Sequence, residues 1–571
     1  MTKNWEEIIL GRLHSIYGDK ISHEQKNRFV AFISNNLVNK TKNTRYWSEL
    51  DIALITYGDS ILEKNKKPLT TLHKFINNYL HDTINTIHIL PFFPFSSDDG
   101  FSVIDFEAVN PELGNWADIE NITGGFKLMV DLVINHVSSK SSWFQNYLKG
   151  EGEGNDFFIE ESADTDLSQV TRPRNTPLLT RFDTKNGIKN VWTTFSDDQI
   201  DLNFGNPEVL YKFLQILHTY INKGAHIIRL DAIAFLWKKV GTTCLHLKQT
   251  HEVVKLMHNF VDLTAPGVII LTETNVPNKE NISYFGNNDE AHMVYQFSLP
   301  PLLLHALNSG NSLYLTKWAS SIPELDKDCT YFNFTSSHDG IGVRPLEGLL
   351  PDDEKEQLYN DVKLSGGLIS TKKNTDGSES AYELNITYFD ALKRTRNGED
   401  GWHEQRFLCS QTIMLGMKGM PAFYIHSLLS SSNFYKGVEQ TGRARTINRE
   451  KLNYNKLVKE INEDSTRGRV FNELLNLISL RKKSRAFHPS SKQQIIDLGK
   501  NVFAFERIAD TGERILAISN VTSQYQQIKI NTSFKNYKFD VISQKDVNVK
   551  QIELTPYQTL WLTKYGFIDK L

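Results

Sequence analysis

The stretch HIIRLDAIAF, residues 226–235, decides the fold, because it is an apolar, β-branched run of strand character that carries a charged pair. Arg229 and Asp231 lie two residues apart, so on a strand their side chains point to the same face. Three segments repeat this design, namely DLVINH at 131–136, LTETN at 271–275 and SSHDG at 336–340. Carboxylates and histidines therefore fall at the C-terminal ends of successive strands, where a β/α barrel keeps its active site.

Eight apolar runs alternate with helical stretches between residues 51 and 487, and eight is the number of strands that closes such a barrel. The runs are IALITYG (52–58), TIHILPFFP (86–94), FKLMVDLVIN (126–135), HIIRLDAIAF (226–235), GVIILTET (267–274), HMVYQFSLP (292–300), CTYFNFTSSHDG (329–340) and PAFYIHSLL (421–429). We therefore expect an α/β protein whose catalytic domain, residues 51–487, is a (β/α)8 TIM barrel.

Four other segments depart from the barrel pattern. Residues 1–50 show apolar positions at helical spacing, which predicts an N-terminal helical extension. Residues 138–199, after the third strand, are polar and rich in Asp, Gly and Pro, which predicts an inserted subdomain. Residues 344–385, after the seventh strand, form an irregular stretch of a length typical of a lid or a binding loop. Short alternating runs such as NVFAFERI predict a C-terminal antiparallel β domain over residues 488–571.

Composition limits the class of ligand. The 571 residues hold 64 basic and 67 acidic side chains, a net charge of −3 that offers no broad field for nucleic acid or an anionic membrane. No apolar window has the length that spans a bilayer, and the amino terminus lacks a signal-peptide pattern. Cys244, Cys329 and Cys409 lie far apart, without metal-ligand spacing. We expect a cytoplasmic enzyme, monomeric or homodimeric, that acts on a small molecule.

The carboxylates suit sugar transfer, which needs one ionised carboxylate and one protonated carboxyl group. Arg229 beside Asp231 predicts an ionised carboxylate of low pKa that can attack an anomeric carbon. Glu273 ends an apolar strand, so burial and the nearby charge of Asp231 are expected to raise its pKa into the range of a general acid. Asp339, next to His338, is expected to bind sugar hydroxyls as positive charge develops on the ring.

Each of these residues alone has a simpler structural explanation. An Asp at a strand end most often caps or turns the chain, and a single His136 is most often a core histidine. Their arrangement at one end of successive strands favours catalysis instead. Phe101, on the polar loop SSDDGFS after the second strand, predicts an aromatic surface beneath a sugar ring.

The four segments resemble, in order and spacing, the signature regions of the α-amylase superfamily of glycoside hydrolases and transglycosylases, and QIDL at 199–202 resembles a fifth region. The resemblance covers roughly residues 50–450. It implies that Asp231 is the nucleophile, Glu273 the acid/base and Asp339 the transition-state stabiliser. It also implies that Arg229, His136 and His338 support them.

Longer strings resemble the sucrose phosphorylase subfamily: ITYGD from Ile55, HILPFFPF from His88, DDGF from Asp98, SLPPLLLHAL from Ser298 and HDGIGV from His338. This resemblance implies a glucosyl pocket of Asp98, Phe101, His136, Arg229, His338 and Arg449. It implies phosphate or acceptor ligands at Arg174, Tyr382, Asn275 and Glu383. Arg174 suits the role because a guanidinium pairs with two oxygens of a phosphate or carboxylate. The alternative for Arg174 is an ordinary surface arginine.

The acceptor is predicted from departures within the subfamily. Sucrose phosphorylases carry His where this chain has Asn275 and Gln where it has Glu383, which disfavours fructose. The strings LTETNVPNKENISYFG (271–286), TPLLTRFD (176–183) and TGRARTINRE (441–450) resemble the glucosylglycerate phosphorylases of this subfamily. The resemblance implies phosphorolysis of glucosylglycerate by double displacement with retention. Sucrose, sucrose 6-phosphate and glucosylglycerol remain alternative substrates.

No cofactor is chemically required, and inorganic phosphate is a co-substrate. The wider superfamily often binds calcium through the residue that matches Asn135, whereas the resemblance to the phosphorylases implies no metal. An α-glucosidase or transglucosidase would use the same carboxylates and is the rival enzyme. A non-catalytic binding protein on a decayed barrel is a third class, which usually lacks one of the carboxylates that this chain retains.

Overall fold

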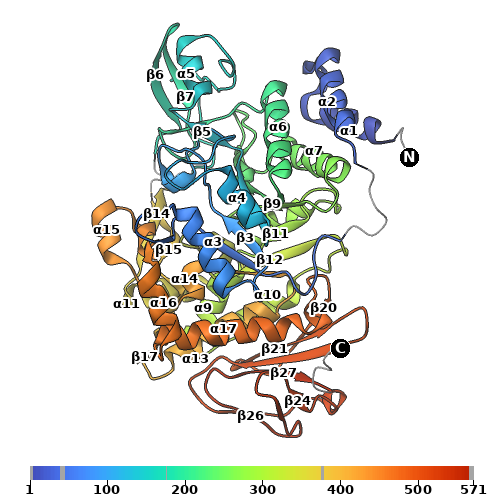
Figure 1. The fold of residues 1–571 in the computed structure, drawn as a ribbon, viewed down its shortest axis with the longest axis vertical. Helices are drawn as coiled ribbons and strands as arrows, with labels where there is room; N and C mark the ends of the chain where they lie inside the picture. Colours follow the sequence, from blue (N-terminus) through green and yellow to red (C-terminus); the bar gives the residue numbers. More distant parts are fainter. Residues whose placement is uncertain (1–3, 39–44, 175, 374–377, 565–571) are drawn as a thin grey trace.

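The structure is a computed structural model that describes residues 4–38, 45–174, 176–373 and 378–564 (Figure 1). Parts of four predicted segments lie outside the described residues. They are residues 1–3 and 39–44 of the N-terminal extension, residue 175 of the inserted subdomain, residues 374–377 of the long stretch after the seventh strand, and residues 565–571 of the C-terminal domain.

The centre of the molecule is a closed barrel of eight parallel strands, which confirms the predicted fold class. Each strand comes from one of the eight apolar runs, and neighbours follow the order β1-β18-β12-β11-β10-β9-β4-β3. The strands are β1 (Ala53–Thr56), β3 (Thr86–Ile89), β4 (Lys127–Val133), β9 (Ala225–Asp231), β10 (Ile269–Thr272), β11 (Met293–Tyr295), β12 (Thr330–Phe334) and β18 (Met420–Tyr424).

Strand register brings the charged residues together. Asp131 of β4 is paired with Arg229 of β9, and Leu230 of β9 is paired with Thr272 of β10. Glu273 follows directly after β10, so it emerges at the same end of the barrel as Asp231. Parallel strands point their C-terminal ends to one face, and the fold thereby collects residues that are far apart in sequence.

Helices cover the outside of the barrel (Figure 1). They form because apolar side chains recur on one face of each segment; α6, for example, buries Val209, Phe213 and Leu217 and begins with the cap Asn206 followed by Pro207. The helices are α3 (Pro68–Tyr79), α4 (Trp116–Thr123), α6 (Pro207–Asn222), α7 (Lys248–Thr264), α8 (Asn278–Ile282), α9 (Leu299–Ser309), α10 (Leu313–Ser321), α13 (His403–Gly416), α14 (Ile425–Leu428), α16 (Tyr454–Asn462) and α17 (Thr466–Lys482).

The N-terminal residues form two helices, α1 (Asn4–Tyr17) and α2 (His23–Asn35), which pack against α7. Arg12 of α1 contacts Glu252 of α7 at 3.3 Å and Asp289 at 2.8 Å. The extension is therefore attached to the outside of the barrel, beside α6 and α7 (Figure 1).

The segment between β4 and β9 holds a small subdomain at one end of the molecule (Figure 1). Its elements are β5 (His136–Ser138), α5 (Ser142–Lys149), β6 (Leu179–Thr184), β7 (Gly187–Trp192) and β8 (Gln199–Asp201). Strands β5 and β8 pair antiparallel, so the first and last residues of the insertion lie side by side above the barrel.

The stretch after β12 is more ordered than its irregular sequence predicts. It forms a helix and a three-stranded antiparallel sheet, because two runs with β-branched and aromatic residues pair as a hairpin. The elements are β13 (Ile341–Gly342), α11 (Asp352–Leu364), β14 (Leu368–Lys373) and β15 (Glu379–Asn385). Strand β15 carries Tyr382 and Glu383 toward the mouth of the barrel.

The C-terminal residues form a six-stranded antiparallel sheet with its own hydrophobic core, at the end of the molecule opposite the insertion (Figure 1). Buried Arg507 of β21 donates to the carbonyl of Gly416 at 2.8 Å, which joins this domain to α13. None of the helices in the described part of the chain is long and apolar enough to span a membrane. The strands are β20 (Lys492–Ile496), β21 (Val502–Ile508), β22 (Arg514–Asn520), β24 (Phe539–Asp540), β25 (Lys545–Asp546) and β27 (Thr559–Thr563).

Candidate active site

Arg229 connects the carboxylates at the barrel mouth. Its Nη1 atom lies 2.7 Å from Asp231 Oδ1 and also pairs with Asp131, while its Nη2 atom lies 3.8 Å from Glu273 Oε2. Asp131 in turn lies 2.7 Å from Nε2 of His88 on β3. All five side chains are almost fully shielded from solvent. A single guanidinium thus contacts the predicted nucleophile and the predicted acid/base.

The backbone after β9 orients Glu273. Ala232 adopts a left-handed conformation, with φ of 49°, and its N–H donates to Glu273 Oε2 at 3.0 Å. Such a conformation costs a non-glycine residue about 1–2 kcal/mol, and strain of this kind gathers at functional sites. The turn therefore fixes the acid/base candidate against the residue that follows the predicted nucleophile.

Burial dominates the electrostatics of Asp231 and Glu273. It raises the pKa of Asp231 to about 8, with Arg229 opposing the rise and Glu273 adding to it. Burial also raises the pKa of Glu273. The expected low pKa of Asp231 is thus wrong for the unliganded site, because removal from water outweighs its ion pair. We place a proton on Glu273 and leave Asp231 ionised, because Asp231 lies closer to the guanidinium.

Asp339 stays ionised for a different reason. Burial would raise its pKa, but Arg445 above all holds that pKa well below its usual range, with Nη1 of Arg445 lying 2.6 Å from Oδ1 of Asp339. Arg449 adds a longer contact of 3.8 Å. Burial lowers the pKa of His338 to about 3, so its ring is neutral and the arginines supply the positive charge.

The structure brings most of the predicted glucosyl-pocket residues to one cavity. Asp98, Phe101, His136 and His338 line it with Asp231, Glu273 and Asp339. The ring of Phe101 stacks on His338 at 4.9 Å, and His136 Nε2 lies 2.8 Å from the carbonyl oxygen of Phe101. One face of Phe101 is therefore covered by His338, and its role beneath a sugar stays a prediction.

Arg449 lies outside the wall of this cavity. It donates to the carbonyl of His338 at 2.8 Å, pairs with Asp99 and lies 5.6 Å over the ring of Tyr57. Arg449 therefore supports the loops that carry the pocket and lines an adjoining hollow.

The four predicted acceptor residues line the same cavity. Arg174 contacts Asp98 at 3.3 Å, and both carboxylate oxygens of Glu383 pair with Arg445. The Oδ1 atom of Asn275 is buried and has no hydrogen-bond partner among the described residues. Burial raises the pKa of Tyr382 to about 12, so its hydroxyl keeps its proton. The contacts of these residues with an acceptor stay predictions.

Sequence reasoning missed several residues that the fold places here. Arg445 lies four residues before Arg449 in the quoted motif TGRARTINRE, and that shared motif was the available signal. Asp131 began the quoted segment DLVINH, yet its ion pair with Arg229 depends on the register of two strands. Gln199, which contacts His136 at 3.0 Å and Asp98 at 3.2 Å, began the quoted QIDL.

A lysine takes the position that a cation would need beside Asn135. Nζ of Lys238 lies 2.5 Å from Asn135 Oδ1 and 2.6 Å from Asp201 Oδ2, and its side chain is 4% exposed. The ammonium group thus neutralises the oxygens that would otherwise hold a metal ion. This contact supports the predicted absence of calcium at Asn135.

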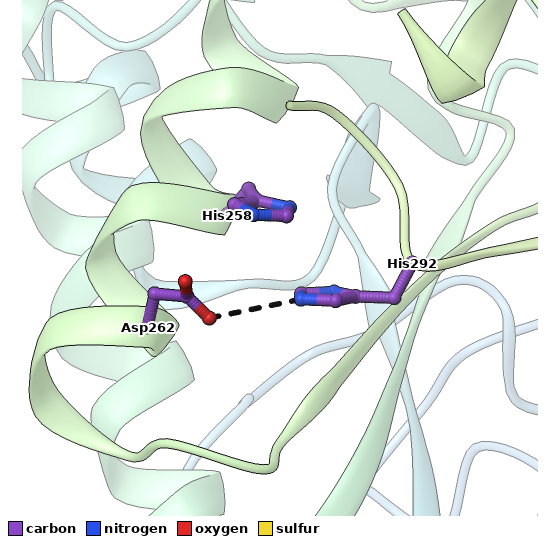
Figure 2. Close-up of side chains that lie close together, drawn as sticks. All are labelled: His258, Asp262 and His292. Carbon is purple, nitrogen blue, oxygen red and sulfur yellow. Dashed lines mark ion pairs between the residues drawn. The ribbon is translucent and has the colours of Figure 1, made fainter. Parts of the chain in front are cut away.

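A second cluster, of His258, Asp262 and His292, contains ligand types that metals use (Figure 2). The N–H of Ile270 donates to His292 Nδ1 at 3.0 Å, so the proton of a neutral ring sits on Nε2. That nitrogen faces Asp262 at 3.8 Å, and the ring stacks on His258 at 4.2 Å. A metal would need a lone pair on Nε2, so this arrangement does not fit one.

Comparison with known proteins identifies the family. A family model described as alpha amylase, catalytic domain, matches residues 76–341. Glucosylglycerate phosphorylase from Spirochaeta thermophila is 47% identical over 530 residues, covering 90% of each chain. The same enzyme from Escherichia coli is 43% identical over 562 residues, covering 98% of this chain and 100% of that one.

A solved structure agrees with this relation. Sucrose 6F-phosphate phosphorylase from Thermoanaerobacter thermosaccharolyticum superposes with a TM-score of 0.74 at 25% identity, covering 89% of this chain and 98% of that one. The resemblance predicted from the sequence is confirmed. The chain therefore belongs to the α-amylase family and, within it, to the glucosylglycerate phosphorylase group.

Proposed function

We propose that the protein is a retaining glycoside phosphorylase that converts 2-O-α-D-glucosyl-D-glycerate and inorganic phosphate into α-D-glucose 1-phosphate and D-glycerate. The observation that carries the proposal is the joint placement of Asp231 and Glu273 around Arg229, in a cavity whose wall also holds Arg174 and Arg445. The names of the relatives support the substrate.

In the first step, a carboxylate oxygen of Asp231 attacks the anomeric carbon and the bond to the glycerate oxygen breaks. Glu273 gives its proton to that oxygen, so glycerate leaves with a hydroxyl group and a β-glucosyl ester forms on Asp231. The raised pKa of Glu273 suits this role, because the group must hold its proton near neutral pH. Asp339, held ionised by Arg445, stabilises the positive charge that develops on the sugar.

In the second step, a phosphate oxygen attacks the same carbon from the side that glycerate left, and the ester bond to Asp231 breaks. Glu273, now a carboxylate, accepts the proton of the incoming phosphate. Two inversions restore the α configuration in glucose 1-phosphate. Arginine at the cavity wall favours phosphate over water, because a guanidinium pairs with two phosphate oxygens.

Incubation with glucosylglycerate, with and without phosphate, tests the proposal. We expect glucose 1-phosphate of α configuration by NMR, and little glucose when phosphate is present. Rapid release of glucose at a rate that phosphate does not change would establish an α-glucosidase instead. If sucrose, sucrose 6-phosphate or glucosylglycerol were phosphorolysed faster than glucosylglycerate, the proposed acceptor would be wrong and the proposed mechanism would still hold.

The proposal also covers the oligomeric state, the compartment, the cofactor and the partners of the enzyme. The enzyme works as a monomer or homodimer in the cytoplasm, without a cofactor, and binds neither nucleic acid nor membrane. The near-neutral net charge of −3 supports the last point. Light scattering at working concentration and assay after dialysis against a chelator test the oligomeric state and the need for a metal.

A further inference from the structure

The proposed reaction uses Arg445 to hold Asp339 ionised, and its position also places it beside the space that an acceptor would occupy. It lies on the short helical turn Ala444–Asn448, after the eighth barrel strand. Its side chain lines both the catalytic cavity and an adjoining hollow that it shares with Arg174. An acceptor that enters or leaves the cavity by this side passes its guanidinium.

Two carboxylates hold this guanidinium from different elements. Its Nε atom donates to Glu383 Oε2 at 3.0 Å and its Nη2 atom to Glu383 Oε1 at 2.5 Å, while Nη1 lies 2.6 Å from Asp339 Oδ1. Glu383 belongs to β15 and is 3% exposed. The fork-shaped pairing with Glu383 therefore fixes the plane of Arg445, and the contact with Asp339 ties that plane to the catalytic centre.

The guanidinium retains the capacity to bind an anion. Each terminal nitrogen carries two N–H groups. The hydrogen bond to Glu383 uses one on Nη2, whereas the contact of Nη1 with Asp339 is an ion pair without a hydrogen bond. The Arg445 side chain is 25% exposed, so part of it faces the cavity. A planar group with donors on neighbouring nitrogens matches the oxygens of a carboxylate or a phosphate.

The proposed reaction places an unusual demand on this wall of the cavity. Glycerate and phosphate are both anions, yet the cavity already contains Asp231, Glu273, Asp339 and Glu383. Like charges at this range repel strongly when water is excluded. An anionic acceptor therefore needs a cation that is fixed near Asp339.

We propose that Arg445 binds the anionic group of the acceptor, which is the carboxylate of glycerate in one direction and phosphate in the other. Glu383 acts through Arg445 as a positioning residue. The proposal rests on the proposed function and adds the residue that distinguishes anionic from neutral acceptors. In the unliganded enzyme Arg445 balances Asp339, and once a glucosyl group engages Asp339 its remaining donors serve the acceptor.

A competition experiment isolates this role from damage to Asp339. α-D-Glucosyl fluoride glucosylates Asp231 with loss of fluoride. This step involves neither glycerate nor phosphate, so it does not depend on binding of an anionic acceptor. Because fluoride leaves without a proton, Glu273 first releases its own proton to solvent. Glycerate and glycerol at equal concentration then compete for one glucosyl enzyme, and the acceptor that attacks gives its hydroxyl proton to the Glu273 carboxylate. The ratio of glucosylglycerate to glucosylglycerol measures acceptor choice alone, because both products share every earlier step.

The Arg445→Gln variant is expected to lower this ratio at least tenfold, since a hydrogen bond to a charged group is lost. Arg445→Lys should recover part of the ratio, because it keeps the charge without the fork. Glu383→Gln should lower it by a smaller factor. Arg181→Gln removes an exposed arginine of β6 that lines neither the catalytic cavity nor the adjoining hollow, and it should leave the ratio unchanged.

A ratio within twofold of the wild type in Arg445→Gln would overturn the inference, even if total turnover fell. The ratio of phosphate to glycerol as acceptor provides a second measure with the same expected change. Wild-type protein that used phosphate but not glycerate would refute the proposed substrate alone, and the phosphate ratio would still decide the role of Arg445. Wild-type protein that preferred glycerol to both anions would overturn both proposals.

Discussion

Asp198 holds together the loops that carry the glucosyl pocket, and its substitution gives the most structurally specific prediction. Its carboxylate accepts hydrogen bonds from the hydroxyls of Ser96 at 2.5 Å, Ser102 at 2.9 Å and Ser139 at 2.5 Å, and from Ser97. Ser96, Ser97 and Ser102 lie in the loop after β3, and Ser139 follows β5. One carboxylate thus joins the loop of Asp98 and Phe101 to the insertion.

The loop needs this support because its backbone is strained. Asp98, Asp99 and Gly100 have φ values of 52°, 51° and 112°, and the left-handed conformation costs each aspartate about 1–2 kcal/mol. A hydrogen bond to a charged acceptor contributes roughly 1.5–3 kcal/mol. Asp198→Asn retains one acceptor oxygen, so we expect a loss of about 2–3 kcal/mol, discounted for the partial exposure of Asp198. The lost hydrogen-bond energy is therefore larger than the backbone strain of Asp98 or of Asp99 taken singly.

Two measurements check the Asp198→Asn variant. The KM for the glucosyl donor should rise about tenfold, with a smaller change in kcat, because Asp98 and Phe101 shift while the catalytic carboxylates stay in place. The midpoint of urea denaturation should fall at neutral pH. Asp197→Asn, at the exposed neighbouring position, is the matched control and should change neither value.

The sign of the pH dependence follows from the same contacts. Burial would raise the pKa of Asp198, but the hydroxyls of Ser139 and the other serines lower it below its usual value. The stabilisation is therefore present above the unfolded-state pKa, near about 3.9, and is lost as pH falls through the folded-state pKa. A difference between wild type and Asp198→Asn that persisted unchanged at pH 3, or a control equal to the variant at pH 7, would refute the reasoning.

Three further predictions concern other parts of the site. Glu273→Gln should reduce the rate of phosphorolysis of glucosylglycerate by a factor of about 10²–10⁴, yet spare glucosylation by α-glucosyl fluoride, because fluoride leaves without a proton. Equal loss of activity with both donors would contradict this role. In the wild type, kcat/KM should fall as pH rises through the raised pKa of Glu273. Gly342→Ala places a Cβ 2.3 Å from Asn275 Oδ1 and should raise the KM for glycerate while the KM for the glucosyl donor holds; equal changes in both would remove Asn275 from the acceptor side. Lys238→Ala leaves the carboxylate of Asp201 buried without its cation and should lower stability by about 3–5 kcal/mol, so an unchanged urea midpoint would show that the ion pair is not needed.

Local sequence patterns were sufficient to predict the barrel. Each of its strands comes from a short apolar run, in most cases with β-branched residues, and such a run indicates a buried strand whatever the rest of the chain does. The same logic located Asp231, Glu273 and Asp339, because a charged residue at the end of a buried strand is visible without coordinates. Local patterns were insufficient in residues 344–385, where two mainly polar runs that carry only a few β-branched and aromatic residues pair as a hairpin.

Only the tertiary structure decided the charges. The pKa of Asp231 depends on how completely the fold removes it from water, which no local pattern records. The contacts of Lys238 with Asn135 and Asp201 form only when the fold brings these distant residues together. The sequence alone therefore determined that Asp231, Glu273 and Asp339 stand at the mouth of the barrel, since strand ends are a local property. The ion pairs and proton positions among those groups were settled by packing, since electrostatic energy depends on distances and burial across the whole fold.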